Sequence, residues 1–500
     1  MKILEFKNIK WLLLITLILH LITSIYSVGF HHLDEHYQII EFANYKLGNN
    51  LPSEMPWEFE AKLRPALQPA IAFSIIKFSQ TIGVTDPFTQ AIFLRILSSL
   101  LSLLSVLMLL YAFKEEVKSE TLLKWFLYLS FFLWFAVYAQ VRFSSEGWSG
   151  SFFFIGFALI YYFRNKGLST FNLINIGIIF GFAFIFRYQV GLMILGLILW
   201  LLFIERMKFK KIIFLLTGII TAILIGVLID KWFYGIWTFP AWNYFQFNIL
   251  QGKASIFGVQ PWYFYITEIF IKGVPPFSIF LIVLPIFWFI YKPKNSFTWI
   301  LIPFLSAHFL IGHKELRFLF PLINIIPLFT VLAVQELEKN KFKKIGLYLY
   351  GKKFKWFVYL FVIVNSIYLI NICFRPADYY VSLYQFIYEN YNNVKTELIF
   401  SNEDPYLRAP EPANFYKSKN LVTKSVLNPD SLRYVVNNNK FDKILFMTNT
   451  FLLDNKYKTG SVKFKKVYSN LPKWVENFNY NHWLERTKIF TVYEISKVKK

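Results

Sequence analysis

Cysteine is almost absent from this chain: its 500 residues include one, Cys373, so no disulfide can form within it. The N-glycosylation acceptor Asn-x-Ser/Thr is missing altogether, although asparagine is frequent. Acidic residues are also few, with 30 Asp and Glu against 53 Lys and Arg. Exported parts of the chain must therefore fold without covalent cross-links, and the missing acceptor favours a bacterial cytoplasmic membrane over a eukaryotic secretory one.

Apolar residues, by contrast, are abundant. They make up 56% of the sequence, and phenylalanine occurs 58 times; soluble domains are about 45–50% apolar. Runs that approach the roughly 20 residues of a transmembrane helix recur from Trp11 to Cys373. The first run follows Lys2, Lys7 and Lys10 but lacks a small-residue cleavage site, which indicates a retained helix. The sequence therefore predicts a polytopic membrane protein.

The net charge of +23 is concentrated in short segments between the apolar runs, at Glu205–Lys211, Lys292–Lys294 and Glu338–Lys355. This placement is typical of cytoplasmic loops. A nucleic-acid-binding protein would gather the charge on one soluble face, so that class is excluded.

Twelve apolar segments are candidate spans by length and composition, about 11–13 being expected once short runs are counted. The basic loops place the N-terminus inside and residues 31–65, 230–275, 312–316 and 374–500 outside. That orientation needs an odd number of crossings, so one segment is not a simple span. The first suspect is 142–204, which Arg142, Arg187 and Gly191 interrupt, and the second is 66–83. The candidate spans are 11–30, 66–83, 90–112, 122–141, 148–163, 171–186, 190–204, 212–229, 276–291, 297–311, 317–336 and 356–373.

Beyond the transmembrane region of residues 1–373 the composition becomes polar. Alternating stretches at Glu397–Phe400, Lys443–Met447 and Ile489–Ile495 predict strands. Residues 374–500 are therefore expected to form a small extracytoplasmic α/β domain.

The first external loop begins with His31-His32-Leu33-Asp34-Glu35-His36. Ionisable groups at a membrane boundary point to function, and Asp34 is a candidate general base for an acceptor hydroxyl. A structural alternative is that Asp34 caps a helix whose dipole favours Glu35. A metal site from His31, Asp34 and His36 is a further alternative, although the spacing matches no established motif.

Further along this loop, Trp57 is a natural interfacial anchor, and Arg64 is suited to a phosphate. The second external loop is dense in aromatic and amide side chains. They fit either an aromatic belt at the membrane surface or a platform for a sugar or lipid headgroup. They are Asp230, Trp232, Tyr234, Trp237, Trp242, Asn243, Asn248, Trp262 and Tyr263.

A short outer turn carries His313-Lys314-Glu315-Leu316-Arg317, which is not a His-Glu-x-x-His zinc motif. Its cations run against the positive-inside tendency, so an anion is expected nearby. Either a lipid phosphate or a pair between Glu315 and Arg317, with side chains reaching to the interface, meets that need.

Together these segments resemble the GT-C glycosyltransferases that use a polyprenyl-phosphate sugar, in the alpha-mannosyltransferase branch (glycosyltransferase family 22) that acts on GPI and lipid-linked oligosaccharides. The resemblance covers about residues 10–340. Departures at 142–146 and at Gln260 leave the acceptor and the sugar open. The matching segments are His31–His36, Trp57-Glu58 with Arg64, Phe186-Arg187, Asp230–Trp237, Asn243, Phe247-Asn248, Phe257-Gly258, Pro261-Trp262-Tyr263 and His313–Phe318.

The resemblance implies an all-α GT-C membrane fold and inverting transfer, most simply of mannose, from a polyprenyl-phosphate donor to a hydroxyl of a lipid-linked or surface glycan. Asp34, alone or with Glu35, would be the base. It implies no cofactor and leaves a divalent metal open. Donor-phosphate ligands would be His313, Lys314, Arg317, Arg64 and Arg187, and substrate-binding residues Trp57, Glu58, Asp230, Asn243, Asn248, Trp262 and Tyr263.

Two other classes of function remain open from the sequence. A transporter or flippase of a lipid-linked sugar would also need cations near a lipid phosphate, but it would often show internal symmetry, which this sequence lacks. A non-catalytic membrane scaffold would bind partners through residues 374–500, and transfer that survives deletion of this domain would indicate that the domain is accessory.

Overall fold

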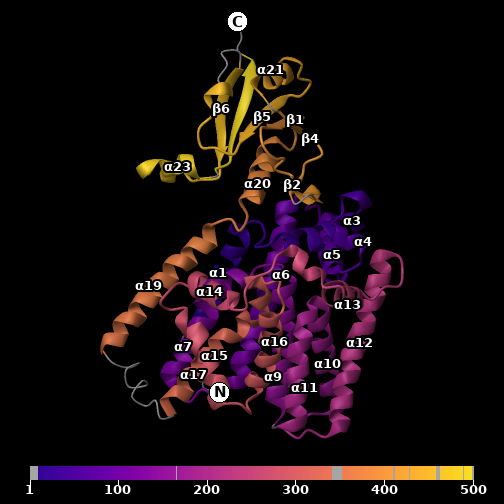
Figure 1. The fold of residues 1–500 in the computed structure, drawn as a ribbon, viewed down its shortest axis with the longest axis vertical. Helices are drawn as coiled ribbons and strands as arrows, with labels where there is room; N and C mark the ends of the chain where they lie inside the picture. The colour runs from indigo at the N-terminus through magenta and orange to yellow at the C-terminus, as the bar shows by residue number, and fades with distance from the viewer. Residues whose placement is uncertain are drawn as a thin grey trace.

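The computed structural model describes residues 9–164, 166–339, 352–408, 411–426, 428–457, 462–487 and 489–497. A tall helical bundle forms most of the molecule, and a small sheet domain lies beyond one end of it (Figure 1). Lys2, Lys7 and much of the predicted basic loop 338–355 lie outside the described residues.

The bundle consists of apolar helices joined by short turns. Within the described residues, five helical segments are long and apolar enough to cross a membrane unaided, and a bent pair adds a sixth. The 20-residue helix α9 and four shorter helices of 13–17 residues, α10, α11, α15 and α16, complete the bundle. The bundle helices are α1 (Ile9–Tyr26), α6 (Pro87–Phe113), α7 (Glu120–Phe132), α8 (Trp134–Gln140), α9 (Ser145–Arg164), α10 (Thr170–Phe186), α11 (Gly191–Phe203), α12 (Phe209–Tyr234), α15 (Ile279–Tyr291), α16 (Ser296–Leu310), α17 (Ile326–Lys339) and α19 (Lys352–Phe374).

The bend between α7 and α8 measures 48° and falls at Leu133. Asn365 on α19 satisfies the backbone groups that the bend exposes: its side chain accepts from Trp134 N at 3.1 Å and donates to Phe132 O at 2.8 Å. Such compensation is needed because backbone polar groups cannot be left unpaired in a lipid environment.

Two long loops at the sheet-domain end of the bundle carry short helices instead of extended chain (Figure 1). The first runs from α1 to α6, and the second from α12 to α15. Their elements are α2 (Leu33–Glu35), η1 (His36–Ile40), α3 (Glu41–Lys46), η2 (Pro52–Glu54), α4 (Trp57–Glu60) and α5 (Leu67–Thr81), then α13 (Pro240–Phe245), η4 (Gln246–Leu250), η5 (Lys253–Phe257) and α14 (Phe264–Lys272). Between α16 and α17 lies the 3₁₀ helix η6 (Leu316–Ile325).

The α5 helix does not cross the membrane. At its start, Ala66 N donates to Asp230 Oδ1 at 2.7 Å, at the loop end of α12. Just after its end, Phe88 at the start of α6 stacks on Tyr416 of the sheet domain, 4.9 Å between ring centroids. Both ends of α5 therefore lie on the same side of the bundle. The helix is apolar because its buried face packs on the first loop.

This position of α5 resolves the conflict over the number of crossings. Removing 66–83 from the predicted spans leaves the odd number that the loop charges require. The first suspect, 142–204, was wrong: it forms the consecutive bundle helices α9, α10 and α11, and Arg187 lies in the turn between the last two.

We expect impermeant labelling to place α5 on the side of the sheet domain. In a Cys373→Ala background, the exposed positions Lys77→Cys on α5 and Asn481→Cys in the sheet domain should react with a membrane-impermeant maleimide from one side. Lys210→Cys, exposed at the start of α12, should react only from the other. Protection of Lys77→Cys until that second side is opened would show that α5 crosses.

The sheet domain confirms the predicted strands. Its five-stranded sheet has the order β4-β1-β5-β7-β6, with β1 parallel to β4 and β5, and β7 antiparallel to β5 and β6. Its elements are α20 (Tyr379–Tyr391), β1 (Thr396–Phe400), the hairpin β2 (Leu407–Arg408) and β3 (Glu411–Pro412), η7 (Asn414–Tyr416), β4 (Leu421–Ser425), α21 (Pro429–Asn437), β5 (Lys443–Thr448), η8 (Asn455–Tyr457), β6 (Val462–Ser469), α22 (Lys473–Glu476), η9 (Tyr480–His482), α23 (Trp483–Arg486) and β7 (Thr491–Lys497).

The sheet domain is fastened to the first loop through buried polar contacts. Phe415 N donates to Glu41 Oε1 at 2.9 Å, and the same oxygen lies 2.8 Å from His36 Nε2. The His36 ring is fully buried and stacked between Phe30 and Tyr416, each 5.2 Å away between centroids. Since His36 follows Asp34 by two residues, the sheet domain helps to set the position of that carboxylate.

Candidate active site

A polar cavity of about 320 Å³ lies where the two long loops, the turn before η6 and the sheet domain meet. Most of the side chains that line it are charged or can form hydrogen bonds. Its lining includes His32, Asp34, Tyr37, Gln38, Trp57, Glu58, Arg64, Arg187, Tyr244, Asn248, Phe257, His313, Glu315, Arg317, Phe318 and Glu411. The outer position predicted for the site from sequence is therefore matched by a real cavity.

Asp34 is presented to this cavity by the short helix α2. His32, and not Asp34, caps the helix: its Nδ1 accepts from Asp34 N at 3.2 Å. The capping interpretation of Asp34 was therefore wrong. Its carboxylate is instead 2.8 Å from Arg317 Nη2 and 3.7 Å from Arg64 Nη2, with a fifth of the side chain exposed. The Asp34 carboxylate therefore does not cap the helix, and it faces the cavity.

Burial by itself would raise the pKa of Asp34. The positive charge of Arg317, the hydrogen bond from His32 and the charge of Arg64 outweigh that effect, so the pKa lies well below its usual range. Asp34 therefore stays ionised at neutral pH, as a proton acceptor must be before it reacts.

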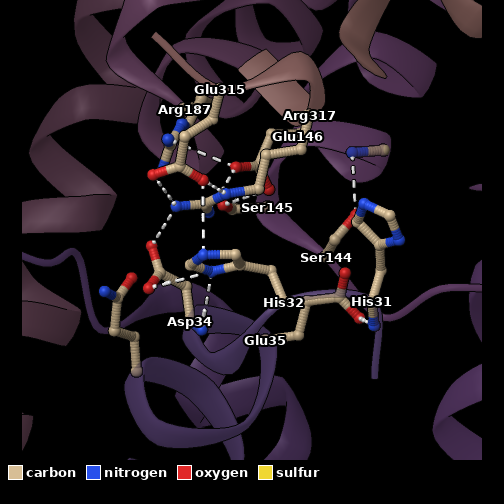
Figure 2. A network of polar contacts seen from close by, with 12 residues as sticks. His31, His32, Asp34, Glu35, Ser144, Ser145, Glu146, Arg187, Glu315 and Arg317 are labelled. Atoms are coloured by element: carbon tan, nitrogen blue, oxygen red, sulfur yellow. Dashed lines mark hydrogen bonds and ion pairs between the residues drawn. The ribbon is translucent and has the colours of Figure 1, made fainter. Parts of the chain in front are cut away.

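Arg317 is the centre of the ion-pair network around Asp34 (Figure 2). Its guanidinium contacts Asp34, Glu315 at 2.5 Å and Glu146 at 3.0 Å. Glu146, from α9, also contacts Arg187 at 3.2 Å. A planar guanidinium can serve several carboxylates at once, so one buried arginine joins the first loop, α9 and η6.

Glu35 follows Asp34 but does not line the polar cavity. It is buried, and its Oε2 accepts from His31 N at 3.2 Å, away from Asp34 (Figure 2). Burial raises the pKa of Glu35 from its ordinary value of 4.5 to about 7. A carboxyl group with this environment stabilises the turn and has no path to a substrate in the cavity.

We expect Glu35 to make the stability of the protein pH-dependent. Because the pKa is raised in the folded state, the stabilising contribution of protonated Glu35 is complete below about pH 4.5 and is lost as the pH rises through 7. In Glu35→Gln this loss disappears, so the unfolding temperature at pH 8 should exceed that of the wild type by a few degrees. The measurement is a set of melting curves from pH 5 to 8 for the variant, the wild type and the exposed-site control Glu60→Gln. The same dependence of unfolding temperature on pH in all three proteins would contradict the assignment.

The alternative metal site at His31, Asp34 and His36 is not assembled. His31 Nδ1 contacts Tyr138 Oη at 3.1 Å, and His36 contacts Glu41. No group of three or more His, Cys, Asp or Glu side chains in the described part of the chain is arranged to hold a metal ion.

Arg64 and Glu58 form the wall opposite Arg317. Arg64 binds Glu58 Oε1 through Nε at 3.1 Å and Nη2 at 2.6 Å, and Gln38 Nε2 donates to Glu58 Oε2 at 2.5 Å. Trp57 stacks on Phe257 of the second loop, 5.8 Å between centroids, so the two loops meet over the cavity.

The two basic residues of the outer turn have different positions. His313 lines the cavity and contacts Glu315 at 3.0 Å; that contact raises the pKa of His313. Lys314 is buried and donates to the carbonyl oxygens of Gln260 at 3.2 Å and Ile311 at 2.5 Å. Of the predicted phosphate ligands, His313, Arg317, Arg64 and Arg187 line the cavity, whereas Lys314 fastens the second loop.

The predicted substrate-binding residues also divide. Trp57, Glu58 and Asn248 line the cavity. Asp230 instead accepts from Ala66 N, and Asn243 donates to Lys62 O at 3.1 Å, so both hold the first loop. Trp262 and Tyr263 are 66% and 47% exposed at the surface, as an aromatic belt would be.

The residues of the site that were missed from sequence include Tyr37, Glu315 and Glu411, which line the cavity. They also include Glu146, which is not in the lining but contacts Arg317 and Arg187. For Glu146 a signal existed, since an acid at the start of an apolar segment is a functional hypothesis by default. Glu315 had been considered only as a partner of Arg317. Tyr37 and Glu411 carried no signal, because only the tertiary structure brings the sheet domain to the first loop.

An apolar cavity of about 630 Å³ lies beside the polar one, between α8, α14, α15, α16 and η6. The two share thin walls. His31 lines the apolar cavity and His32 the polar one; in η6, Leu316, Leu319 and Phe320 face the first, whereas Arg317 and Phe318 face the second. An apolar space and a charged space are thus separated by single residues.

Comparison with known proteins is consistent with this architecture. Residues 11–401 match the model of the Alg9-like mannosyltransferase family. The GPI alpha-1,2-mannosyltransferase 3 of Xenopus laevis is 26% identical over 323 residues, 63% of this chain and 58% of that protein. A probable Dol-P-Man:Man(7)GlcNAc(2)-PP-Dol alpha-1,6-mannosyltransferase of Schizosaccharomyces pombe is 32% identical over 149 residues, 29% of this chain and 26% of that protein.

Among solved structures, ArnT from Cupriavidus metallidurans bound to undecaprenyl phosphate superposes with a TM-score of 0.51 and 11% identity, covering 98% of both chains. At this identity the match establishes the fold, which is GT-C. The match spans a little over half the length of the frog relative. The family model covers most of this chain. The chain is an integral membrane protein with the GT-C fold and belongs to the Alg9-like mannosyltransferase family.

Proposed function

We propose that the protein transfers mannose, with inversion, from a polyprenyl-phosphate donor to a hydroxyl of a lipid-linked or surface glycan. The observation that carries the proposal is the pair of adjoining cavities. A donor of this class has an apolar chain and a charged sugar phosphate, and η6 separates two spaces of those two characters. The same donor class is supported by the Dol-P-Man in the name of the Schizosaccharomyces pombe relative and by the undecaprenyl phosphate bound to ArnT.

In this mechanism Asp34 accepts the proton of the acceptor hydroxyl. The acceptor oxygen forms a bond to the anomeric carbon as the bond from that carbon to the phosphate oxygen breaks. The polyprenyl phosphate leaves with the electron pair of the broken bond. The configuration at the anomeric carbon inverts because the acceptor attacks one face of this carbon and the phosphate leaves from the opposite face. Asp34 alone is the base, since Glu35 does not reach the cavity.

The leaving phosphate gains negative charge, and donors placed where charge develops stabilise such a transition state. His313 lines the cavity and has a raised pKa, so it can donate a hydrogen bond or a positive charge. Arg317 and Arg64 contact Asp34, and Arg187 is linked to Arg317 through Glu146. Because Arg317 already contacts three carboxylates, its main task is to fix Asp34.

For location, we propose a bacterial cytoplasmic membrane with the cavity on the extracytoplasmic face. The missing N-glycosylation acceptors favour this membrane, and the basic loops at the opposite end of the bundle orient the site outward. The curated relatives named above come from eukaryotes, so the choice of membrane is tested by fractionating the source cells.

The direct test is transfer from radiolabelled polyprenyl-phosphate mannose in membranes that contain the protein. A labelled glycolipid absent from control membranes is the expected product. EDTA in a parallel reaction tests for a divalent cation. Movement of the donor across vesicles without a glycosidic product would replace this proposal with a flippase, and incorporation of another sugar from its polyprenyl phosphate would correct the choice of mannose.

A further inference from the structure

We propose that the end of the polar cavity formed by Tyr37, Gln38, Glu58 and Glu411 binds the acceptor sugar, and that the sheet domain supplies a wall of this subsite through Glu411. The inference rests on the glycosyl transfer proposed above and names where the sugar with the attacking hydroxyl is held. It also gives the sheet domain a direct part in recognition of the acceptor.

The cavity has two ends of different charge. At one end Arg317 contacts Asp34, and Arg187 and His313 are linked to Arg317 through Glu146 and Glu315. On the other side of the site, Arg64 contacts both Asp34 and Glu58. Glu58 therefore belongs to the second end of the cavity. A phosphate finds hydrogen-bond donors at the end of Arg317, Arg187 and His313, and it is disfavoured beside Glu411, which has no cationic partner among the described residues. The donor headgroup and the acceptor are thereby sorted by charge, with Asp34 between them.

Tyr37 gives the first sign of a ligand at this end. It follows Asp34 by three residues and lines the cavity, although only 4% of it is exposed. Its hydroxyl has no hydrogen-bond partner among the described residues. Buried hydroxyl groups are nearly always paired in folded proteins. A hydroxyl left unpaired beside a cavity is suited to pair with a group that enters it.

Glu411 gives the second, independent sign. The hairpin β2–β3 carries it from the sheet domain to the cavity. Its neighbour across the hairpin, Arg408, is engaged by Asp378 at 2.7 Å and lies over the ring of Tyr380. In the described part of the chain no cation lies within ion-pair distance of Glu411. Burial, and the negative charge of Glu58, raise the pKa of Glu411.

A sugar ring provides what this end lacks. Its hydroxyl groups can donate to the carboxylates of Glu411 and Glu58 and pair with Tyr37 and Gln38. Trp57, also in the lining, offers an apolar surface for the ring. An uncharged polyol therefore fits the subsite better than an anion, and an apolar ligand would leave Tyr37 and Glu411 unpaired.

The test is binding of a free oligosaccharide without any donor. Full-length protein in detergent is titrated with α-linked mannotriose, and its unfolding temperature is followed. We expect the wild type to be stabilised, and the half-saturating concentration to rise about tenfold in Tyr37→Phe and in Glu411→Gln, each of which removes one hydrogen-bonding or charged group. The matched controls Tyr480→Phe, 89% exposed, and Asp430→Asn, 86% exposed, should match the wild type.

Two results would overturn the inference. One is an unchanged half-saturating concentration in both cavity variants. The other is no stabilisation of the wild type by mannotriose, maltotriose or chitotriose. Neither result depends on transfer, because no donor is present. If the wild type binds the oligosaccharide but forms no labelled product in the transfer assay, that result counts against the proposed reaction and not against the subsite.

Discussion

Asp34→Asn should lower transfer of the labelled sugar by about a thousandfold, the scale on which a general base contributes. Asparagine keeps the shape of the side chain but cannot accept the proton of an acceptor hydroxyl. The contact with Arg317 at 2.8 Å loses its charge, so a small fall in stability is also expected. The measurement is the initial rate with polyprenyl-phosphate mannose, alongside gel filtration in detergent to confirm a folded protein.

The matched control is Glu35→Gln, the same replacement of a carboxyl group by an amide one position away. Glu35 is buried against His31 N and has no access to the cavity, so this variant should retain most of its transfer activity. Equal rates for Asp34→Asn and the wild type would remove Asp34 from the mechanism. Equal losses in both variants would point to a shared structural role of the turn.

Arg317→Ala should be the most destabilising single change in the site. It takes the cation from Asp34, Glu315 and Glu146, and Arg317 itself is 6% exposed. Removing one partner from a buried charged network costs about 3–5 kcal/mol, because the other charges remain buried without compensation. The free energy of unfolding in detergent measures this loss, and the variant is expected to accumulate poorly in membranes.

The pH dependence of that loss identifies its cause. In the wild type the depressed pKa of Asp34 contributes stability that is present above its ordinary value of 3.8 and is lost as the pH falls through the lower folded value. The variant lacks this contribution, so the difference between the two proteins should be greatest at neutral pH and shrink on acidification.

Arg164→Ala is the control for the loss of an arginine. Its partner Glu205 lies 3.4 Å away in an exposed pair, which is worth about 0–1 kcal/mol. A destabilisation of Arg317→Ala no larger than that of Arg164→Ala would contradict a central role for the buried network.

Several features of the site followed from local sequence. His31–His36 and His313–Arg317 stand at the ends of apolar runs, and a membrane boundary concentrates charged groups where they remain hydrated. Arg64 was identified by the suitability of a guanidinium for a phosphate, and Arg187 by the family resemblance. These segments meet in the cavity because the loops and turns that carry them lie at the sheet-domain end of the bundle. The strands of the outer domain followed from their alternating pattern, which is also local.

Local sequence could not separate residues that touch a substrate from residues that hold the loops. Asp230, Asn243 and Lys314 have the polar character expected of ligands, yet each is engaged with backbone groups of a distant segment. Glu35 and Asp34 are adjacent carboxylates, and only the direction of the turn puts one in the cavity and the other in the interior.

By itself the sequence determined that this chain is a helical membrane protein with an outer polar site and a small outer sheet domain. Those properties depend on composition and on periodicity within single segments, and both can be read from the sequence without knowing which segments contact one another. Only the tertiary structure decided that α5 stays outside, that Arg317 gathers three carboxylates and that Glu411 reaches the cavity. Each of these depends on contacts between segments far apart in the chain, and no local pattern specifies them.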